Sequence, residues 1–564
     1  MKRWMKWTLG TIGGLAIAGY LSKDYVFLHL PGWIAPHVYN NRPVKWQPGP
    51  ATAALPADRR PPNIVLIVAD DLGYNDISFN GGGVAGGLLK TPNIDALGRQ
   101  GVTFADGYAG NATCAPSRAA LMTGRYPTRF GYEFTPAEVH PPKWFPSGLI
   151  RTDVSFSRTI ANFPTQWEHK TIFDEDAARA PATTADKGVP GSEITIAELL
   201  KGRGYHTIHL GKWHLGEGKG MRPEAQGFDE SLGFMIGGQM YLPESSPDVE
   251  NSKQDFDPID KFLWANLPFS VQYNGGDRFK PARYMTDYLT DEAIDAIKVN
   301  RNRPFFMYLA YNAPHTPLQA LKADYDALPQ IADHRTRVYA AMIRALDRGV
   351  GRVMAELKAQ GLDQNTLVIF TSDNGGAHYI GLPDINRPYR GWKATFFEGG
   401  VKVPFFMRWP AMIKPGTQIA GPVSHFDIFA TASDVAGATL PRDRPIDGVD
   451  LLPFIEGKKT GLPHNTLFWR SGPYRVVRDG DWKLQLLDLP RVALLYDMKT
   501  DPTERRDVAA LHPDVVARLK GLIAQHDRES VKPAWPSLIR SPIAIDRPLG
   551  TKPKAGETYI YWSN

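Results

Sequence analysis

Two clusters of oxygen-bearing side chains stand out in this 564-residue chain, each placed directly after an apolar run. Their members are Asp70, Asp71, Asp373 and Asn374. Adjacent carboxylates repel one another unless a proton or a cation lies between them. Three carboxylates and an amide offer only oxygen ligands, which suit Ca²⁺, Mg²⁺ or Mn²⁺ and suit zinc poorly. Together the clusters predict a site for a hard divalent cation, although a helix cap or a solvated turn would explain either cluster alone.

Cys114 is the only cysteine in the chain and therefore cannot form a disulfide within it. The apolar pattern after Pro116 predicts a short helix that begins near residue 114, with Arg118 one turn further on. The amide groups and the dipole at a helix N-terminus favour negative charge at that position. From the residues alone, Cys114 is either a buried structural thiol or a thiolate nucleophile.

The hydrophobic pattern indicates which elements must position these residues. Continuous apolar, β-branched runs are typical of strands buried on both faces of a mainly parallel sheet. The runs are Asn63 to Ala69, Tyr205 to Leu210, Pro304 to Tyr311 and Thr366 to Thr371. Helical periodicity lies between them, at Asn93 to Gln100, Glu193 to Lys201, Asp287 to Lys298 and Thr336 to Gln360. This alternation predicts an α/β fold, with a large, mostly parallel mixed sheet flanked by helices on both faces and with ligands bound beyond the carboxyl ends of its strands.

The chain is too long for one compact core, so we expect a large domain and a smaller one. The predicted main domain spans residues 63–462, with an insertion at 132–190. A small subdomain, an antiparallel sheet with one helix, is expected at 463–530. Residues 1–24 and 25–62 precede the main domain as an export or anchor segment and a linker, and 531–564 are expected to form a C-terminal extension over the surface.

Composition and charge exclude several classes of protein. A content of 43% hydrophobic and 22% charged residues indicates neither a disordered chain nor a polytopic membrane protein. The net charge of +6 comes without a basic run, so nothing indicates nucleic-acid binding. Lys2, Arg3 and Lys6 precede an apolar stretch at residues 7–21, which is shorter than the roughly 20 residues of a membrane span. Whether it is a cleaved signal peptide or an uncleaved membrane anchor, this stretch predicts export to the periplasm or the extracellular space.

The segment around Cys114 resembles the sulfatase signature, Cys-x-Pro-Ser-Arg followed by a Leu/Met-Thr-Gly-Arg tail. Other parts of the chain are similar to further motifs of the same family, the formylglycine-dependent, arylsulfatase-like enzymes of the alkaline phosphatase superfamily. In chain order these parts are Asn63 to Gly73, Gly204 to Thr207, Gly211 to Gly216, Pro314 to Pro317, Asp373 to Gly376, Gly391 to Lys393, Glu398 to Gly400, Arg478 to Lys483 and Leu495 to Asp497. The resemblance thus runs in order from about residue 62 to residue 525.

The resemblance implies the hydrolysis of sulfate esters through a modified residue. A maturation enzyme would convert Cys114 to formylglycine, a step whose signal also needs Pro116 and Arg118. An oxygen of residue 114 would join the four oxygen-bearing residues around one divalent cation, usually Ca²⁺. The hydrated aldehyde would attack sulfur, and its second hydroxyl would later expel sulfate. The side chains implied to line the sulfate pocket are those of Arg118, Lys212, His214, His315 and Lys393.

The resemblance does not identify the substrate, which is a sulfated small molecule or a sulfated glycan. Loops at 132–190 and 237–280 are expected to set specificity, and their aromatic residues either stack on a substrate or form a local core; these are Trp144, Phe145, Trp167, Tyr241 and Trp264. Three other histidines are expected to be core residues, namely His206, His209 and His378. Two other functions stay open: a phosphate or phosphonate ester hydrolase on the same fold, and a non-catalytic protein that binds sulfated glycans.

Overall fold

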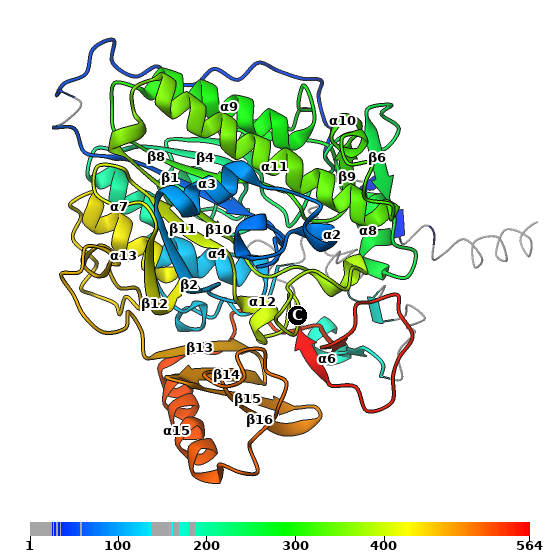
Figure 1. The fold of residues 1–564 in the computed structure, drawn as a ribbon. Coiled ribbons are helices and arrows are strands. Elements are labelled where there is room, and N and C mark those ends of the chain that lie inside the picture. The colour runs from blue at the N-terminus through cyan, green and yellow to red at the C-terminus, as the bar shows by residue number, and fades with distance from the viewer. Residues whose placement is uncertain are drawn as a thin grey trace, which may run out of the picture.

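A nine-stranded sheet forms the centre of the computed structural model (Figure 1). The structure describes residues 25, 28–29, 32–33, 35–56, 59–136, 157, 160–161, 169–179 and 187–564. From edge to edge the strands are β12 (Thr417–Ser424), β2 (Val102–Tyr108), β11 (Phe405–Arg408), β10 (Thr366–Ser372), β1 (Asn63–Ala69), β8 (Phe305–Ala310), β4 (His206–Lys212), β5 (Glu230–Phe234) and β7 (Gln272–Tyr273). The strands from β10 to β5 pair in parallel, whereas β11 and β7 are antiparallel to their neighbours.

Both faces of the sheet are covered because its central strands are apolar on both sides. On β1, Val65 and Ile67 belong to one core cluster, while Leu66 and Val68 belong to another. The first cluster takes in residues of α3 (Pro92–Gln100), α9 (Met285–Asn300) and α11 (His334–Ala359). The second takes in residues of α4 (Cys114–Thr123), α7 (Ile196–Gly202) and α13 (Phe426–Val435). The prediction of a mostly parallel sheet between two helical layers is confirmed.

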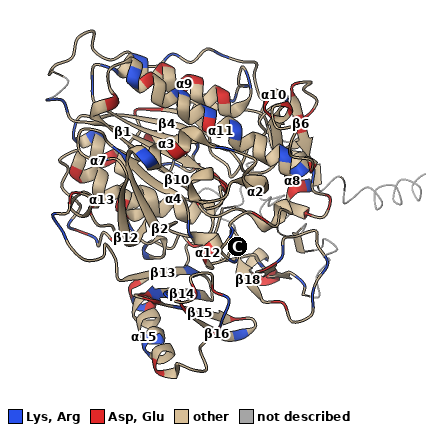
Figure 2. Cartoon of the chain, viewed as in Figure 1, with Lys and Arg blue, Asp and Glu red and all other residues tan. Residues whose placement is uncertain are grey.

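The charged residues follow this layering. Figure 2 shows Lys, Arg, Asp and Glu along the outer sides of α9 and α11, while the central strands carry few. Shorter elements surround the sheet: α2 (Val84–Gly87), α6 (Glu175–Arg179), α8 (Pro258–Asn266), α10 (Lys322–Asp326), α12 (Glu398–Val401), α14 (Leu452–Ile455), and the pair β6 (Val249–Ser252) and β9 (Leu318–Leu321). Within the described residues, no helix is long and apolar enough to cross a membrane. The predicted anchor at residues 7–21 lies outside them.

A second, antiparallel sheet follows the main one along the chain. It consists of β13 (Thr466–Ser471), β14 (Tyr474–Asp479), β15 (Trp482–Asp488) and β16 (Arg491–Asp497). The amphipathic helix α15 (Pro513–Glu529) covers one face of it, with Leu519 and Ile523 packed against Val477, Leu484 and Leu495. The predicted small sheet with one helix is therefore present, and it gains β13, which the sequence analysis did not identify.

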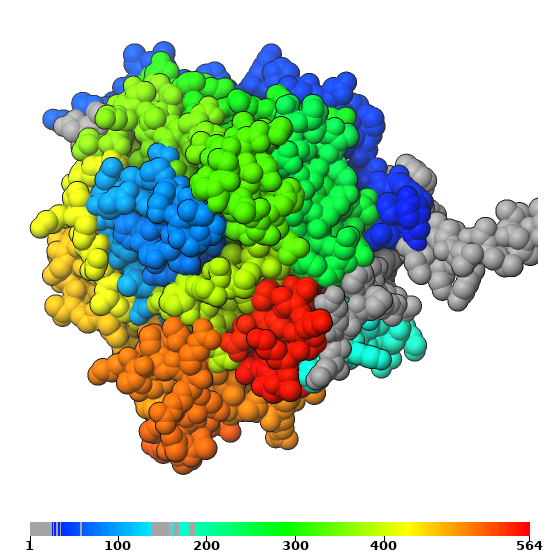
Figure 3. Space-filling view, turned by 45° about the vertical axis from the view of Figure 1, so that its right-hand side comes forward, coloured from blue at the N-terminus to red at the C-terminus, as the bar shows by residue number. Residues whose placement is uncertain are grey.

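The C-terminal residues differ from the surface extension that we expected. They form β17 (Ile539–Ala544) and β18 (Tyr559–Ser563), which pair with each other and, through β17, with β3 (Ile172–Phe173). Ile543 and Ile560 join the larger core cluster, so this segment is an integral part of the fold. Figure 3 shows it, in red, beside the small subdomain in orange. Neither strand alternates apolar and polar residues, so the sequence pattern did not indicate them.

Candidate active site

The carboxyl ends of four adjacent parallel strands bring the predicted residues together. Asp70 and Asp71 follow β1, and Asp373 and Asn374 follow its neighbour β10. On the other side of β1, His315 lies beyond β8, and β4 ends in Lys212. Cys114 begins α4 as predicted, next to this edge, and Lys393 arrives on the loop before α12. Residues more than 300 positions apart thus meet where an α/β sheet binds ligands.

The first acidic pair lies in contact with the Cys114 thiol and with two lysines. Lys212 Nζ lies 2.7 Å from Asp70 Oδ2, and Lys393 Nζ lies 2.8 Å from Asp71 Oδ2. Cys114 Sγ is 3.6 Å from Asp70 Oδ1 and 3.7 Å from Asp71 Oδ1. All five side chains are buried or nearly so. Asp71 has a φ of 63°, a left-handed conformation that turns the chain sharply after β1.

The second pair completes an oxygen-rich wall. Asp373 Oδ1 accepts a hydrogen bond from the Asp71 amide, and Asp373 Oδ2 pairs with Arg118 at 2.8 Å. Asn374 Nδ2 donates to Asp71 Oδ1 at 2.8 Å, whereas Asn374 Oδ1 is buried and has no hydrogen-bond partner. A buried acceptor without a partner costs free energy unless something else binds it. A hard cation would supply that partner, so the donor set fits Ca²⁺, Mg²⁺ or Mn²⁺.

The pKa values of the carboxylates in this wall also favour a bound cation. Burial raises the pKa of Asp70 to about 7, although Lys212 opposes the shift. Burial would also raise the pKa of Asp71, but Lys393 and His315 outweigh it and hold that pKa below its usual range. Ligand atoms of Asp70, Asp71, Cys114 and His315 all lie within 4.8 Å of one another. This acidic cluster favours a bound cation, since a cation stabilises carboxylates that burial otherwise protonates.

Unmodified Cys114 would be a poor nucleophile in these surroundings. Burial raises the pKa of its thiol well above the usual value, and the charge of Asp373 adds to the effect. The position at the start of α4 does not compensate for this, although a helix N-terminus favours a thiolate. Of the two interpretations drawn from the residues alone, the thiolate nucleophile therefore finds no support. Plain cysteine at this position acts only as a buried thiol.

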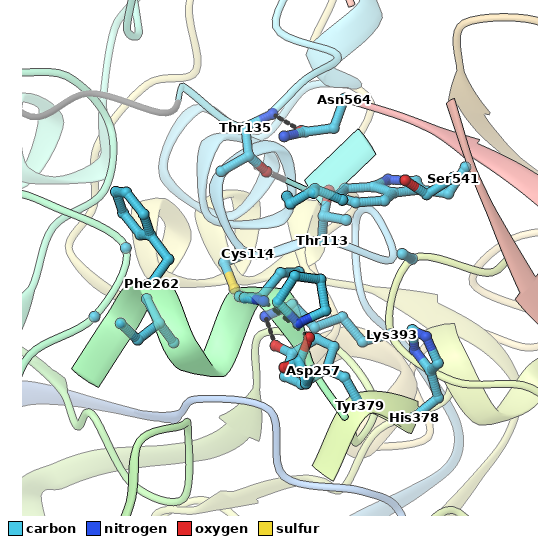
Figure 4. A pocket seen from close by; sticks show the side chains of 18 of the residues that line it. Thr113, Cys114, Thr135, Asp257, Phe262, His378, Tyr379, Lys393, Ser541 and Asn564 are labelled. Carbon is cyan, nitrogen blue, oxygen red and sulfur yellow. Dashed lines mark hydrogen bonds between the residues drawn. The ribbon is translucent and has the colours of Figure 1, made fainter. Parts of the chain in front are cut away.

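A cavity of about 250 Å³ opens at this cluster (Figure 4). Three of the five predicted pocket residues line it beside Cys114, namely His214, His315 and Lys393. The other two, Arg118 and Lys212, do not line it. They are fully buried behind the acidic wall, where their charges meet Asp373 and Asp70.

Two of the cavity histidines, His214 and His315, have pKa values that favour the neutral ring. Burial lowers the pKa of His315 to about 3, and its Nδ1 lies 2.5 Å from the Thr316 carbonyl oxygen, which leaves Nε2 facing Asp71 at 3.7 Å. Burial, together with Lys212 and Arg118, lowers the pKa of His214 well below its usual value. His214 Nδ1 has no hydrogen-bond partner within the described structure. Both rings therefore offer an unprotonated nitrogen near residue 114.

The three histidines expected in the core lie in different surroundings. His206 pairs with Glu230, and His209 bonds to Ser231, both away from the cavity. His378 instead lines the cavity, so for this residue the expectation was wrong. It stands two residues after the Gly375-Gly376 turn, a position that no motif marked.

The specificity loops are resolved in part. Tyr241 is buried and donates to the carbonyl oxygens of Asn312 and His315, and Trp264 donates to Asp260. Neither lines the cavity; Tyr241 belongs to the core, whereas Trp264 is only partly buried. Trp144, Phe145 and Trp167 lie outside the described residues.

Sequence reasoning missed Tyr379, whose hydroxyl lies 3.1 Å from Asp71 Oδ2 and 3.0 Å from Lys393 Nζ. It also missed how the small subdomain holds the loop that carries Lys393. The Phe396 amide donates to Tyr474 of β14, and the Glu398 amide donates to the Glu504 carboxylate. No local pattern could have indicated these contacts, because each joins segments more than 70 residues apart.

A cation site, a buried position 114 and two neutral histidines at the edge of a parallel sheet define a hydrolase of tetrahedral anionic esters. The sequence profile of the sulfatase family matches residues 62–438, and a profile of the C-terminal part of N-sulphoglucosamine sulphohydrolase matches 390–528. The chain belongs to the sulfatase family, and it is a sulfuric ester hydrolase.

Known relatives agree with this assignment. Steryl-sulfatase of Mus musculus is 32% identical, over 74% of this chain and 68% of that protein. N-acetylgalactosamine-6-sulfatase of Homo sapiens is 30% identical, over 85% of this chain and 88% of that protein. Among solved structures, Ps i-CgsB in complex with k-i-k-neocarrahexaose is 32% identical, with a TM-score of 0.67 over 84% of this chain and 95% of that one.

Proposed function

We propose that this enzyme hydrolyses sulfate monoesters through formylglycine formed from Cys114, with one divalent cation held by Asp70, Asp71, Asp373 and Asn374. The observation that carries the proposal is Asn374 Oδ1, which is buried beside three carboxylates and residue 114 and has no hydrogen-bond partner among the described residues. The high pKa of the Cys114 thiol also supports it, because a plain thiol would be inert there. The oxygen ligands suit Ca²⁺, Mg²⁺ or Mn²⁺, and we assign Ca²⁺ because the sulfatase family usually holds it.

Formylglycine, once hydrated, supplies an attacking oxygen and a second hydroxyl, and the cation lowers the pKa of the attacking group. The side chains of this protein do the rest. Lys393 points into the cavity and keeps its proton, because Asp71 and residue 114 outweigh the burial that would lower its pKa. We assign to Lys393 the proton or hydrogen bond given to the leaving oxygen, with His315 beside it.

His214 is the base that we assign to the second half of the reaction. Its ring is neutral and its Nδ1 has no partner among the described residues, so it can accept the proton of the second hydroxyl at position 114. Loss of that proton expels sulfate and restores the aldehyde. Arg118 and Lys212 hold Asp373 and Asp70 in place and add positive charge behind the sulfuryl group.

Two further expectations complete the proposal. A formylglycine-generating maturation enzyme is a required partner, because the chain encodes cysteine at position 114. Export to the periplasm or the extracellular space follows from the basic and apolar N-terminus, with residues 7–21 as a membrane anchor if they are not cleaved.

The relatives do not choose among substrates, since one is named for a sterol sulfate and another for a sulfated hexosamine. Their common chemistry is the sulfate monoester, which is the activity to test first. Cys114→Ser should lower multiple turnover of an aryl sulfate by more than about 1,000-fold, because serine lacks the second hydroxyl. Peptide mass spectrometry should find the aldehyde, or its hydrate, at residue 114 of active wild-type enzyme.

Two outcomes would overturn the proposal. One is a plain thiol at residue 114 in fully active protein, and the other is sustained turnover by Cys114→Ser. Rates on the matching aryl phosphate and phosphonate esters separate the remaining alternative, because a phosphate or phosphonate hydrolase would prefer those esters to the sulfate.

A further inference from the structure

Beyond the acidic cluster, the cavity is walled by apolar side chains from two distant parts of the chain. Helix α8 contributes Ile259, Phe262 and Leu263, and the C-terminal segment contributes Ile543 and Trp562. Figure 4 shows Phe262 across the cavity from Ser541, with Cys114 between the two walls. One end of the cavity is therefore charged and the other is a hydrophobic chamber.

The polar groups along the apolar walls are already bonded to the protein. The Thr171 hydroxyl donates to the Ser541 hydroxyl, and both Asp257 carboxylate oxygens accept amide hydrogens of α8. Asn564 Oδ1 accepts from the Thr135 amide at 2.7 Å, a bond that Figure 4 draws. Most of the surface that the two walls offer to a ligand is apolar.

His378 is the exception on this side of the cavity. Its Nδ1 is buried and has no partner in the described structure, and burial lowers its pKa to about 3. A neutral imidazole can bind one polar group of a ligand. A hexose ring would leave its other hydroxyls against Phe262, Leu263 and Trp562, where each would lose its hydrogen bonds to water.

We propose that the chamber binds the alcohol part of a sulfate monoester whose alcohol is apolar and cyclic, such as an alicyclic alcohol or a phenol, rather than a sugar. This inference rests on the proposed sulfatase function and names its substrate class. An apolar cavity of ~150 Å³ holds one benzene ring. The whole cavity, at about 250 Å³, has room for one such ring together with the sulfate group at its charged end.

The wall formed by the C-terminal segment lies outside the shared part of the family. The two family profiles end at residues 438 and 528, whereas β17 and β18 span residues 539 to 563. Trp562 is only partly buried and faces the chamber from the last strand. The structure thus assigns Trp562 as a specificity-determining residue, one that acts on binding of the alcohol rather than on the sulfuryl chemistry.

The test compares two substrates with the same kind of leaving group. Cyclohexylmethyl sulfate and galactose 6-sulfate both release a primary alcohol, so intrinsic reactivity does not favour the apolar ester. Mature wild-type enzyme should show a kcat/KM at least roughly 10-fold higher for cyclohexylmethyl sulfate, from burial of its ring. A kcat/KM for galactose 6-sulfate that equals or exceeds this value would overturn the inference and leave the sulfatase function intact. If neither ester, nor an aryl sulfate, is hydrolysed, the proposed function itself fails.

A pair of matched variants tests the wall. Trp562→Thr should lower kcat/KM for cyclohexylmethyl sulfate by roughly 10-fold, mainly through KM, and should narrow the preference over galactose 6-sulfate. Trp482→Thr is the control, because Trp482 is also a half-buried strand tryptophan but packs in the small subdomain, away from the chamber. Threonine suits a strand at both positions. If Trp562→Thr leaves the ratio of the two kcat/KM values unchanged, Trp562 does not determine substrate specificity.

Discussion

Replacing Lys483 by Met should destabilise the small subdomain strongly, although Lys483 contacts no part of the cavity. Its Nζ lies 2.7 Å from Glu398 Oε1 and 3.0 Å from Glu504 Oε1, and all three side chains are at most 1% exposed. Met fills a similar volume without the charge, so two buried carboxylates would face each other uncompensated. Breaking a buried ion pair by removing one partner costs about 3–5 kcal/mol.

The pH dependence of this loss identifies its cause. Burial raises the pKa of Glu504 to about 7 against the opposing charge of Lys483, and Glu398 adds to the rise. In the variant the pKa of Glu504 should rise further, and the pKa of Glu398, which Lys483, Lys402 and Arg478 hold below its usual value against burial, should rise as well. The folded state then binds protons that the unfolded state has released. Stability then falls as the pH rises from about 4.5 through the raised values. The free-energy loss should therefore be larger at pH 8 than at pH 5.

Urea unfolding, followed by tryptophan fluorescence at these two pH values, measures the effect. The control is Lys458→Met, because the pair between Lys458 and Glu456 is exposed on the lysine side and should contribute about 0–1 kcal/mol. A loss in Lys483→Met no larger than that of the control, or a loss of the same size at both pH values, would refute the argument. The outcome bears on catalysis, since Glu398 lies five residues after Lys393.

Two further predictions concern the cation and pH. Asp373→Asn should lower both the bound Ca²⁺, measured by elemental mass spectrometry, and the sulfatase activity by at least about 10-fold, because a charged ligand is lost. The control Asp363→Asn, which also removes the partner of an arginine, should change neither quantity. Full activity of metal-free enzyme would contradict the proposed site. Burial lowers the pKa of His526 to about 4, so its stabilising contribution is present above pH 6.5 and is lost as pH falls towards 4, by up to about 1.4 kcal/mol per unit. The thermal unfolding temperature of His526→Phe should therefore change less between pH 7 and pH 5 than that of wild type or of the exposed-site control His334→Phe. If the unfolding temperatures of all three proteins change equally with pH, His526 does not contribute to the pH dependence of stability.

The sequence predicted the central strands well because their burial is simple. β1 and β10 are buried along their whole length, and their boundaries were predicted to within one residue. β2 and β12 were not predicted because Asp106 and Gln418 interrupt their apolar patterns. β2 pairs with β11, and β12 pairs with β2, so both strands depend on pairing between segments far apart in the chain. Local pattern identifies a strand only when its surroundings are uniform.

The site divides in the same way. Local motifs contained Cys114, the acidic pairs, His315 and Lys393, and the fold brings all of them to one edge of the sheet. Tyr379 and Trp562 could not be found from sequence, since each acquires its role only through the position of a segment remote in the chain. The residues that meet at this edge of the sheet were therefore predicted from the sequence, whereas the shape of the cavity was not.

The burial of α4 has a consequence for the timing of maturation. All ten residues of the helix are buried, and Cys114 itself is 3% exposed. An enzyme that oxidises this thiol must first bind the chain around it, and the burial of α4 in the folded protein prevents such binding. The proposed formylglycine would therefore have to form before folding, and protein already folded with cysteine at position 114 would not be activated by adding the oxidising enzyme afterwards. Producing active material would then depend on the two proteins meeting while the chain is still unfolded.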